Sequence, residues 1–456
     1  MIQKGAPSQG RGLPLFFDEV HGGEGFPVTE QEAIDRIHSV YPTGKKNGIE
    51  NMRALMARLG NVQSLLTMVH VAGTNGKGSC CAMIERMLRA AGYKTGLYTS
   101  PYIERYNERI RINGVPIAGD ALAALVECVW PAVEACERDG IHITEFELGT
   151  ALALMHFGME HVDVAIIEVG LGGRLDPTNI IKPAVTVITE VGMDHMQYLG
   201  NTIEEIALEK AGIMKRGVPV VLGQQEKAVR AVLLAAARGL DIPVIDPDAQ
   251  NVHEDSRSVT FDVRLGGERI KALRVALCGR HQAENACAAL GAVWALKKHG
   301  LNVPVEAVRR GMASVSWPGR LEYFGNVLLD GAHNDPGVRA LCAYCDAWLA
   351  RERTVLVSCM MGDKETDKMC QRLSSRVQCV VCTQVDVPRA MEAQALADTF
   401  ARHGVQTFVE EEPQRALERA RHIAGQEGTV LVAGSLYLIG AIRTALRKEK
   451  EFAHVI

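Results

Sequence analysis

At 456 residues the chain exceeds what one hydrophobic core usually supports, so we expect two domains. It is 47% hydrophobic and 23% charged, as soluble globular proteins are, and its net charge of −4 argues against binding nucleic acid or an anionic membrane. The N-terminus lacks the apolar core of a secretory signal, and no stretch approaches the ~20 apolar residues of a membrane span. We therefore expect a cytoplasmic protein.

The first part of the chain predicts alternating helices and strands after a leader of about thirty residues, which is rich in glycine and proline and which we expect to be loose. Near-continuous apolar runs, such as VDVAIIEVG and AVTVITEVG, are typical of strands in a parallel sheet covered on both faces. Thr202 and Glu205 have the spacing of a capping box. The predicted helices are 28–40, 47–61, 77–92, 118–139, 147–161 and 202–215, and the predicted strands are 67–73, 94–100, 162–170, 184–192 and 218–223.

Two hairpins and a hinge organise the rest of the pattern. The first hairpin, 108–117, turns at Asn113–Gly114, and the second, 258–275, precedes a helix at 280–300. The hinge is Trp317–Pro318–Gly319, after which strands and helices alternate again from 326 to 447. We predict an α/β fold with an N-terminal P-loop nucleotide-binding domain built on a mostly parallel sheet, residues 1–315, and a smaller Rossmann-like α/β domain, residues 316–456.

The twelve cysteines include two C-x-x-C pairs, Cys342/Cys345 and Cys379/Cys382, a spacing that also occurs in zinc sites. The first pair lies in an amphipathic helix pattern and shares one face. The second pair lies in a strand pattern, where an offset of three residues places the side chains on opposite faces. This arrangement favours buried, reduced thiols over a zinc site.

A glycine-rich segment, VAGTNGKGS, spans residues 71–79 between a predicted strand and a predicted helix. Backbone amides in such a turn converge on an anion, the helix N-terminus adds positive potential, and Lys77 would face the β- and γ-phosphates of a nucleotide. The usual motif would need glycine at Val71 and a hydroxyl directly after Lys77, whereas the hydroxyl comes at Ser79. Taken alone, the segment therefore also fits a glycine turn without phosphate.

Companion segments remove that alternative, because together with GTNGKGS they resemble the folylpolyglutamate synthase/dihydrofolate synthase family of the Mur ligase superfamily. They follow the order and spacing of that family over most of the chain. These segments are 99–110, 144–154, 166–179, 194–213, 279–290, 317–322 and 330–334. The resemblance implies ATP-dependent formation of an amide bond between a folate and L-glutamate, with closure of the second domain over the first.

The resemblance also implies a set of site residues. Glu168 suits such a role, because a carboxylate at the end of an apolar strand requires a cation. The implied ATP-binding residues are Gly73, Thr74, Asn75, Gly76, Lys77, Gly78, Ser79, Asn285, Arg320 and Asp330. Mg²⁺, as two ions, would be bound by Ser100, Glu168, His195 and Lys210, the last as a carbamate, and a monovalent cation is a further candidate. Lys77, Lys210 and His333 are the implied catalytic residues, and Thr144, Glu145, Phe146, Glu147, Leu175, Asp176 and Pro177 are implied near the pteroate.

Several alternatives remain open at this level. Lys210 could be an ordinary lysine on a helix surface, paired with Glu205 or Glu209. The chain could be a peptidoglycan ligase acting on a UDP-muramyl substrate, or a nucleotide-binding protein without catalysis, although a pure binder would need no second metal site. We expect a monomer that binds ATP, L-glutamate and a folate or dihydropteroate. Whether dihydrofolate synthesis accompanies polyglutamylation is not resolved.

Overall fold

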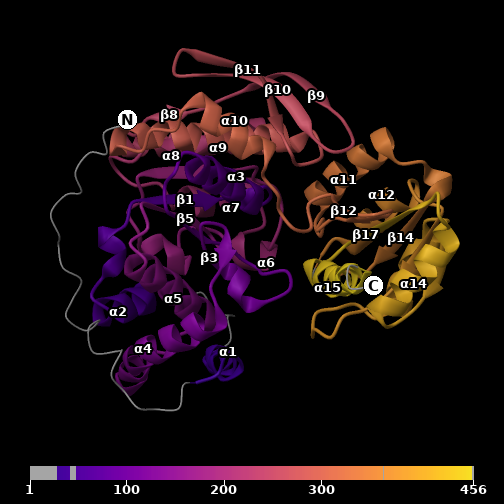
Figure 1. The fold of residues 1–456 in the computed structure, drawn as a ribbon, viewed down its shortest axis with the longest axis horizontal. Coiled ribbons are helices and arrows are strands. Elements are labelled where there is room, and N and C mark those ends of the chain that lie inside the picture. The colour runs from indigo at the N-terminus through magenta and orange to yellow at the C-terminus, as the bar shows by residue number, and fades with distance from the viewer. Residues whose placement is uncertain (1–27, 42–47, 363, 454–456) are drawn as a thin grey trace.

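The computed structural model describes residues 28–41, 48–362 and 364–453, so that most of the predicted loose leader lies outside the described residues. Two α/β bodies lie side by side, each built on its own sheet (Figure 1). The first body also carries a separate three-stranded sheet, which projects from the edge of that body (Figure 1). This arrangement confirms the predicted α/β fold with mostly parallel sheets.

The sheet of the first body has eight strands in the order β4-β3-β2-β5-β1-β6-β7-β8. Six of them run parallel, and the predicted hairpin adds β3 and β4 as an antiparallel edge. The strands are β1 (Met68–Ala72), β2 (Thr95–Tyr98), β3 (Ile110–Ile112), β4 (Val115–Pro116), β5 (Val164–Glu168), β6 (Val185–Ile188), β7 (Val220–Leu222) and β8 (Val244–Ile245). Because β1 lies between β5 and β6, the strand order reverses there, and ligands of open α/β sheets bind beyond the carboxyl ends of such strands.

Helices cover both faces of this sheet, as the two-residue period of its strands requires. Val69 and Val71 of β1 face one layer, whereas Met68 faces the other. One layer contains α3 (Lys77–Ala90), α9 (His281–Ala295) and α10 (Val305–Ala313). The other contains α1 (Glu30–Ser39), α2 (Glu50–Arg58), α4 (Gly119–Arg138), α5 (Glu145–Met159), α6 (Met196–Leu199), α7 (Ile203–Ala211) and α8 (Lys227–Leu240).

Some elements differ from the sequence predictions. The second predicted hairpin is present as β10 (Val259–Leu265) and β11 (Glu268–Val275), but β9 (Ala249–Glu254), α8 and α10 were not predicted. Helix α5 begins two residues before the predicted start, because Thr144 and Glu147 form a capping box there. Short 3-10 helices occur at Val62–Leu65, Tyr106–Arg109, Pro177–Ile180, Leu296–His299 and Arg351–Arg353.

The second body contains a six-stranded sheet in the order β12-β13-β17-β14-β15-β16, parallel except for β12. The strands are β12 (Glu322–Phe324), β13 (Val327–Leu329), β14 (Thr354–Ser358), β15 (Cys379–Cys382), β16 (Gln406–Val409) and β17 (Thr429–Ala433). Helices α11 (Asp335–Trp348), α12 (Thr366–Ser374) and α13 (Ala393–Arg402) cover one face, and α14 (Pro413–Ala424) and α15 (Leu436–Ala453) cover the other. No helix of the described ranges has both the length and the apolar character needed to cross a bilayer.

The cysteines behave as the sequence predicted. Cys379 and Cys382 lie in the two different cores of the second body, on opposite faces of its sheet, whereas Cys342 and Cys345 share one core. All twelve cysteines are free thiols. Within the described part of the chain, no three His, Cys, Asp or Glu side chains form a group that could bind a metal ion. The C-x-x-C pairs are therefore packing residues.

A loop of the first body joins the two bodies by docking on α15. Glu104 forms ion pairs with Arg443, at 2.8 Å, and with Arg447, at 3.0 Å. The carbonyl oxygen of Ile103 lies so close to Gly440 that a Cβ atom there would be 2.0 Å from it. The bodies can thus approach only because α15 has no side chain at position 440.

We expect Gly440→Ala to destabilise the protein by roughly 1–3 kcal/mol, because the new methyl group meets a backbone atom that cannot move without separating the two bodies. Gly239→Ala is the matched control: it also lies in a helix, and a Cβ there would meet nothing within 4 Å. Replacing Gly239 of α8 by alanine should stabilise the helix by up to ~1 kcal/mol. Thermal unfolding of the two variants measures the difference, and equal melting temperatures would contradict the close contact at Gly440.

Candidate active site

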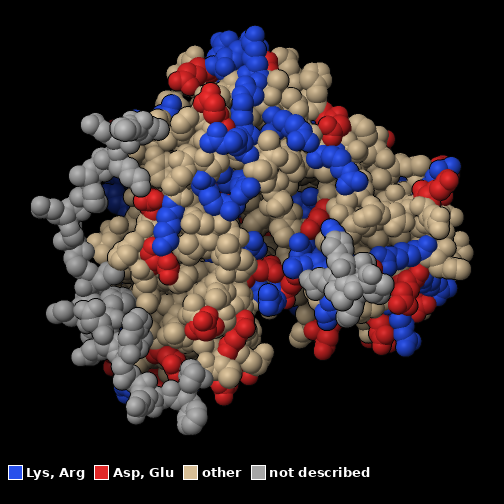
Figure 2. Space-filling model, viewed as in Figure 1, with Lys and Arg blue, Asp and Glu red and all other residues tan. Residues whose placement is uncertain are grey.

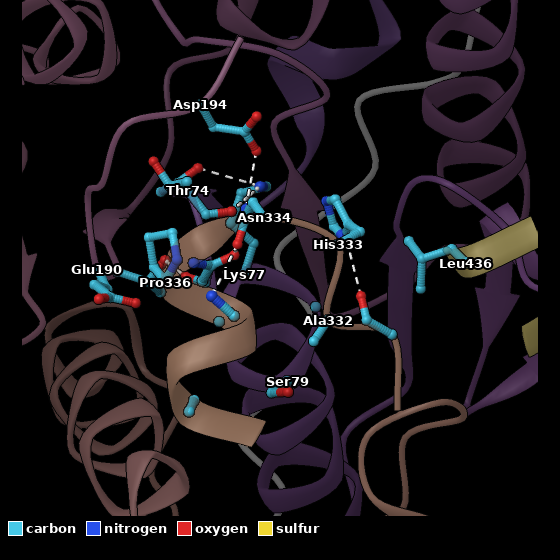
Figure 3. A pocket seen from close by; sticks show the side chains of 18 of the residues that line it. Thr74, Lys77, Ser79, Glu190, Asp194, Ala332, His333, Asn334, Pro336 and Leu436 are labelled. Carbon is cyan, nitrogen blue, oxygen red and sulfur yellow. Dashed lines mark hydrogen bonds between the residues drawn. The ribbon is translucent and has the colours of Figure 1, made fainter. Parts of the chain in front are cut away.

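A cavity of about 360 Å³ lies beyond the carboxyl ends of β1, β5 and β6, between the two bodies. The first body contributes the glycine-rich loop after β1, and the second contributes the start of α11 and the loops around it. Figure 3 shows Asn334 of the second body between Asp194 and the loop that carries Thr74 and Lys77. The implied ATP, metal and catalytic residues all line this cavity, namely Gly73 to Ser79, Ser100, Glu168, His195, Lys210, Asn285, Arg320, Asp330 and His333.

The loop after β1 is held in a shape that suits a phosphate group. Gly76 has φ +81°, and a Cβ there would lie 2.1 Å from Asn285 Oδ1, so no other residue fits this position. The Thr74 amide donates to the Glu190 carbonyl at 2.7 Å, and its hydroxyl donates to Gly192 O at 3.0 Å. Because α3 begins at Lys77, its N-terminal amides and its dipole add positive potential at the same point.

Lys77 turns back over this loop. Its Nζ donates to the carbonyl oxygens of Gly73 and Thr74, each at 3.1 Å. Both acceptors are neutral carbonyl oxygens, so these two hydrogen bonds do not compensate the charge of the ammonium. The loop, the helix terminus and Lys77 together can bind the phosphates of a nucleotide.

Glu168 is the last residue of β5 and is 4% exposed. Its carboxylate accepts a hydrogen bond from the Ser100 amide at 3.1 Å. Burial raises the pKa of Glu168 to about 6, although Lys77 and the Ser100 amide act in the opposite direction. A buried carboxylate beside a serine hydroxyl and the phosphate loop has the oxygen ligands that Mg²⁺ prefers.

Lys210 is buried, with 3% exposure, although it is a charged residue on a helix. Its Nζ donates to the Gly73 carbonyl at 2.9 Å. The alternative of an ordinary surface lysine is therefore wrong, because α7 packs this side chain against the phosphate loop. Lys210 and Lys77 share Gly73 as an acceptor, which places two amines at one turn of the chain.

An ion pair that the sequence did not predict crosses the cavity. Asp194 of the first body accepts from Lys364 Nζ of the second at 2.6 Å, and each side chain is 8% exposed. Although burial opposes its ionisation, His195 and Lys364 hold the pKa of Asp194 well below its usual range. Asn334 Nδ2 donates to Asp194 at 2.9 Å and to Asn75 at 3.1 Å. These contacts connect the second body directly to the phosphate loop.

The second body presents two further groups after β13. The Asp330 carboxylate accepts hydrogen bonds from the backbone amides of Leu321 and Ala332, each at 3.0 Å. His333 Nδ1 donates to the Gly331 carbonyl at 2.8 Å, and burial lowers the pKa of His333 to about 4. The ring is therefore neutral at pH 7, and its Nε2 is an acceptor. Such a group can accept a hydrogen bond from an amine that enters the cavity.

Comparisons with known proteins agree with this geometry. The family model of the Mur ligase middle domain matches residues 71–293, and that of the Mur ligase glutamate ligase domain matches residues 319–436. The dihydrofolate synthase/folylpolyglutamate synthase of Bacillus subtilis is 39% identical to the chain over 432 residues, which cover 91% of this chain and 99% of the relative. The chain belongs to the folylpolyglutamate synthase/dihydrofolate synthase family.

Solved structures of this family have the same fold. Mycobacterium tuberculosis folylpolyglutamate synthase complexed with ADP superimposes with a TM-score of 0.84 and 32% identity, covering 91% of this chain and 98% of that one. Escherichia coli FolC in complex with DHPP and ADP superimposes with a TM-score of 0.83 and 30% identity, covering 92% and 98%. Members of the Mur ligase family are ATP-dependent ligases, and this chain is one of them.

The segments implied near the pteroate lie beside the cavity and do not line it. Thr144 and Glu147 form hydrogen bonds with each other in the capping box of α5, and Asp176 caps the 3-10 helix that starts at Pro177. Phe146 packs on Gly170, a lining residue, so closely that a Cβ at Gly170 would lie 2.3 Å from its ring. Binding of a pteroate by Thr144, Glu145, Phe146, Glu147, Leu175, Asp176 and Pro177 stays a prediction of the family resemblance.

Sequence reasoning missed several charged or aromatic residues that line the cavity. These are Glu190, Asp194, Glu284, Lys364, Arg389 and Tyr437. Asp194 had a usable signal, because it directly precedes His195 in a segment that carries the family resemblance. Lys364 had none, because its role depends on a contact with a residue 170 positions away.

Proposed function

We propose that this protein joins L-glutamate to a folate in an ATP-dependent reaction that passes through an acyl phosphate. One observation carries the proposal: a phosphate loop with Lys77, a buried carboxylate and charged groups of the second body line a single cavity. Related proteins have been solved with ADP, with an ATP analogue and folate, and with DHPP, which supports nucleotide and pterin substrates. The peptidoglycan-type reaction has no comparable support.

The first step is phosphoryl transfer. A folate carboxylate oxygen attacks the γ-phosphorus of ATP, and the bond from that phosphorus to the bridging oxygen breaks. ADP is the leaving group, and the folate carboxylate becomes an acyl phosphate. Lys77 offsets the charge of the transferred group, and the amides at the start of α3 orient it. Arg320 and Asp330 would hold the nucleotide from the second body, and Asn285 would contact it on the adenine side.

The second step is acyl transfer. The amine of L-glutamate attacks the acyl carbon, and the tetrahedral intermediate collapses to an amide and releases inorganic phosphate. The neutral imidazole of His333 is positioned in the cavity wall to accept a hydrogen bond from that amine. The ion pair of Asp194 with Lys364 holds the second body against the phosphate loop, which excludes water from the acyl phosphate.

The residues at the end of β5 fit a magnesium site. Ser100, Glu168 and His195 would hold one ion. Glu168 fits this role because a buried carboxylate needs a cation as its partner. A carbamate on Lys210 would supply ligands for a second ion. Mg²⁺, when bound, would neutralise charge on the ATP phosphates. A monovalent cation stays a prediction without an assigned residue.

The proposal also includes domain boundaries, a compartment and an oligomeric state. We place the first domain at residues 1–315 and the second at 316–456, since α10 ends at Ala313 and β12 begins at Glu322. Twelve free cysteines suit the reducing conditions of the cytoplasm. We retain a monomer as the expected state, since the implied ATP, metal and catalytic residues of a single chain line one cavity.

Release of ADP tests this function. Native protein is incubated with ATP, Mg²⁺ and L-glutamate, and with tetrahydrofolate, dihydropteroate or UDP-muramyl-alanine in turn. Glutamate-dependent ADP release with tetrahydrofolate supports the proposal. Release with dihydropteroate adds dihydrofolate synthesis, a second function favoured by the DHPP-bound relative. Release with the muramyl substrate alone would refute both.

A carbamate on Lys210 makes a separate prediction. We expect Lys210→Ala to lower ADP release on the order of 100-fold, because one charge-stabilising group at the phosphates is lost. Acetate or bicarbonate should restore part of the activity, since a small carboxylate fits the space of the lost side chain. Lys210→Met is the control, because it fills that space and leaves no room for a carboxylate. Equal rescue of both variants would count against the carbamate.

A further inference from the structure

Where the two bodies meet, acidic and basic side chains lie next to one another on the face drawn in Figure 2. One of the basic residues at this junction is Arg443 of α15, whose guanidinium group forms ion pairs with one carboxylate from each body. Its Nη1 donates to Glu104 of the first body at 2.8 Å, and its Nε donates to Glu322 of the second at 2.9 Å. All three side chains are mostly buried. None of them takes part in the proposed reaction.

Glu104 belongs to the loop that follows β2 and carries Ser100, and we call residues 99–108 the Ser100 loop. The Glu108 carboxylate holds this loop together, because it accepts hydrogen bonds from the backbone amides of residues 103–105 at distances between 3.0 and 3.2 Å. At the start of the loop, the Ser100 amide donates to the Glu168 carboxylate at 3.1 Å. Ser100, Glu108 and Glu168 also line one small cavity, of about 30 Å³. The loop that Arg443 binds is therefore continuous with the proposed magnesium site.

Glu322, the other partner of Arg443, holds the hinge between the two bodies. Its Oε2 accepts a hydrogen bond from the Gly319 amide at 2.9 Å. The Gly319 carbonyl in turn accepts from the Gly331 amide at 2.8 Å and from Arg320 Nη1 at 3.3 Å. Since Arg320 and Gly331 both line the main cavity, Glu322 fixes the turn from which Arg320 reaches the proposed nucleotide site.

The shape of the arginine side chain makes this double contact possible. A guanidinium group is a rigid plane with donors on several sides, so one side chain can bind two carboxylates in fixed directions. Here Nε and Nη2 bind Glu322, at 2.9 and 3.0 Å, and Nη1 binds Glu104. One side chain of the second body therefore links the Ser100 loop to the hinge that carries Arg320.

We propose that Arg443 is a positioning residue for the complex of nucleotide and magnesium, an inference that rests on the proposed function and its metal site. While the second body packs on the first, Arg443 holds Glu104, and Glu104 keeps the Ser100 loop in the position where Ser100 can bind the ion. Through Glu322, the same guanidinium group keeps Arg320 directed at the nucleotide. Groups that orient a metal ligand raise metal affinity although they do not touch the ion. Metal binding in the first body thus depends on a side chain of the second.

The alternative is that these ion pairs only hold the two bodies together. Two observations favour positioning. Both carboxylates lie on segments that carry a proposed ligand of the same complex, Ser100 on one side and Arg320 on the other. The Ser100 loop is also fixed through its backbone, because Gly440, three residues before Arg443 on α15, leaves room for the Ile103 carbonyl. A contact that served stability alone would not need both a charge and a backbone fit at one loop.

The test measures ADP binding by isothermal titration calorimetry, once with excess Mg²⁺ and once in EDTA. Glu104→Gln frees the Ser100 loop and leaves Arg443 paired with Glu322. We expect the Kd for ADP in Mg²⁺ to rise about three- to tenfold in this variant, while the Kd in EDTA stays within about twofold of native. Arg443→Gln also releases the hinge, so its Kd should rise under both conditions.

Two further variants separate positioning from stability. Gly440→Ala displaces the Ser100 loop without removing a charge, so it should weaken ADP binding in Mg²⁺ and leave binding in EDTA unchanged. Glu449→Gln is the matched control, because it removes an ion pair of the same helix that stays within the second body, with Arg421 at 3.0 Å. It should match native protein in both titrations. Thermal unfolding of each variant shows that it is folded at the temperature of the titration.

Other outcomes would overturn the proposal. Equal Kd values for native protein and Glu104→Gln in Mg²⁺, whatever their melting temperatures, would show that the junction only joins the two bodies. A rise by the same factor in Mg²⁺ and in EDTA would show that the Ser100 loop acts on the nucleotide and not on the metal. Native protein that binds no ADP, or binds it equally well with and without Mg²⁺, would instead refute the nucleotide and metal sites of the proposed function, which keeps the two failures distinguishable.

Discussion

Replacing Lys77 by alanine is expected to abolish glutamate-dependent ADP release, with a loss on the order of 1,000-fold or more. The ammonium is the positive side chain that the phosphate loop itself carries, and it is held at the loop by two neutral carbonyl groups. No other group of the loop can replace its charge. The measurement is the initial rate of ADP release with ATP, L-glutamate and tetrahydrofolate.

The fold should survive this change, because Lys77 lies at the start of α3 and, among the described residues, its side chain donates hydrogen bonds only to two loop carbonyls. Lys227→Ala is the matched control, since Lys227 is also the first residue of a helix, is exposed, and does not line the cavity. Its activity should equal that of native protein. Circular dichroism and thermal unfolding of both variants should match native protein, and turnover of Lys77→Ala within tenfold of native would contradict the assignment of the loop.

The second large effect is expected from Glu168→Gln, which should lower Mg²⁺-dependent ADP release roughly 100-fold or more. The substitution preserves the size of the side chain, and the glutamine carbonyl can still accept from the Ser100 amide. What it removes is the buried negative charge. Activity measured against Mg²⁺ concentration should show that excess metal does not rescue the variant.

The same substitution should stabilise the protein without metal. The pKa of Glu168 is about 6 in the folded chain against an ordinary 4.5, so ionising it costs the native state ~2 kcal/mol. Below pH 4.5 the group is neutral in both states and this cost is absent; it develops as the pH rises through about 6 and then stays constant. In EDTA, the melting temperature of Glu168→Gln should therefore exceed that of native protein at pH 7.5. The two melting temperatures should approach each other at pH 4.5.

Glu127→Gln serves as the control for this pair of effects, because Glu127 is exposed on α4 and lies away from the cavity. It should change neither ADP release nor the pH dependence of stability. A Glu168→Gln variant that is less stable than native protein at pH 7.5 would contradict the view that this carboxylate is placed for a cation at the expense of the fold.

Local signals in the sequence predicted most of the elements. The capping box of Thr202 and Glu205 begins α7 as predicted, because a cap involves only a few adjacent residues. The same signal, Thr144 followed by Glu147, was available at α5 and would have corrected its start. Two of the misses, α10 and β9, are short or moderately polar elements whose stability comes from packing against α3, α9 and β10, whereas α8 is a long apolar helix that its own pattern could have predicted.

The sequence by itself determined the chemistry at the sheet edge. Strands β1, β5 and β6 are parallel, so the residues that follow them meet at one edge, and the phosphate loop and Glu168 could be grouped without a structure, whereas His195 was implied only by the family resemblance. Spacing along the chain supplied that inference because the geometry of a parallel sheet converts it into proximity.

Only the tertiary structure decided how the second body completes the site. It pairs Asp194 of the first body with Lys364 of the second and places Asn334 between Asp194 and the phosphate loop. These contacts join segments that no strand order or helix period relates. Their physical basis is the packing of two separate bodies, which depends on surface shape, as at Gly440, and leaves no periodic trace in the sequence.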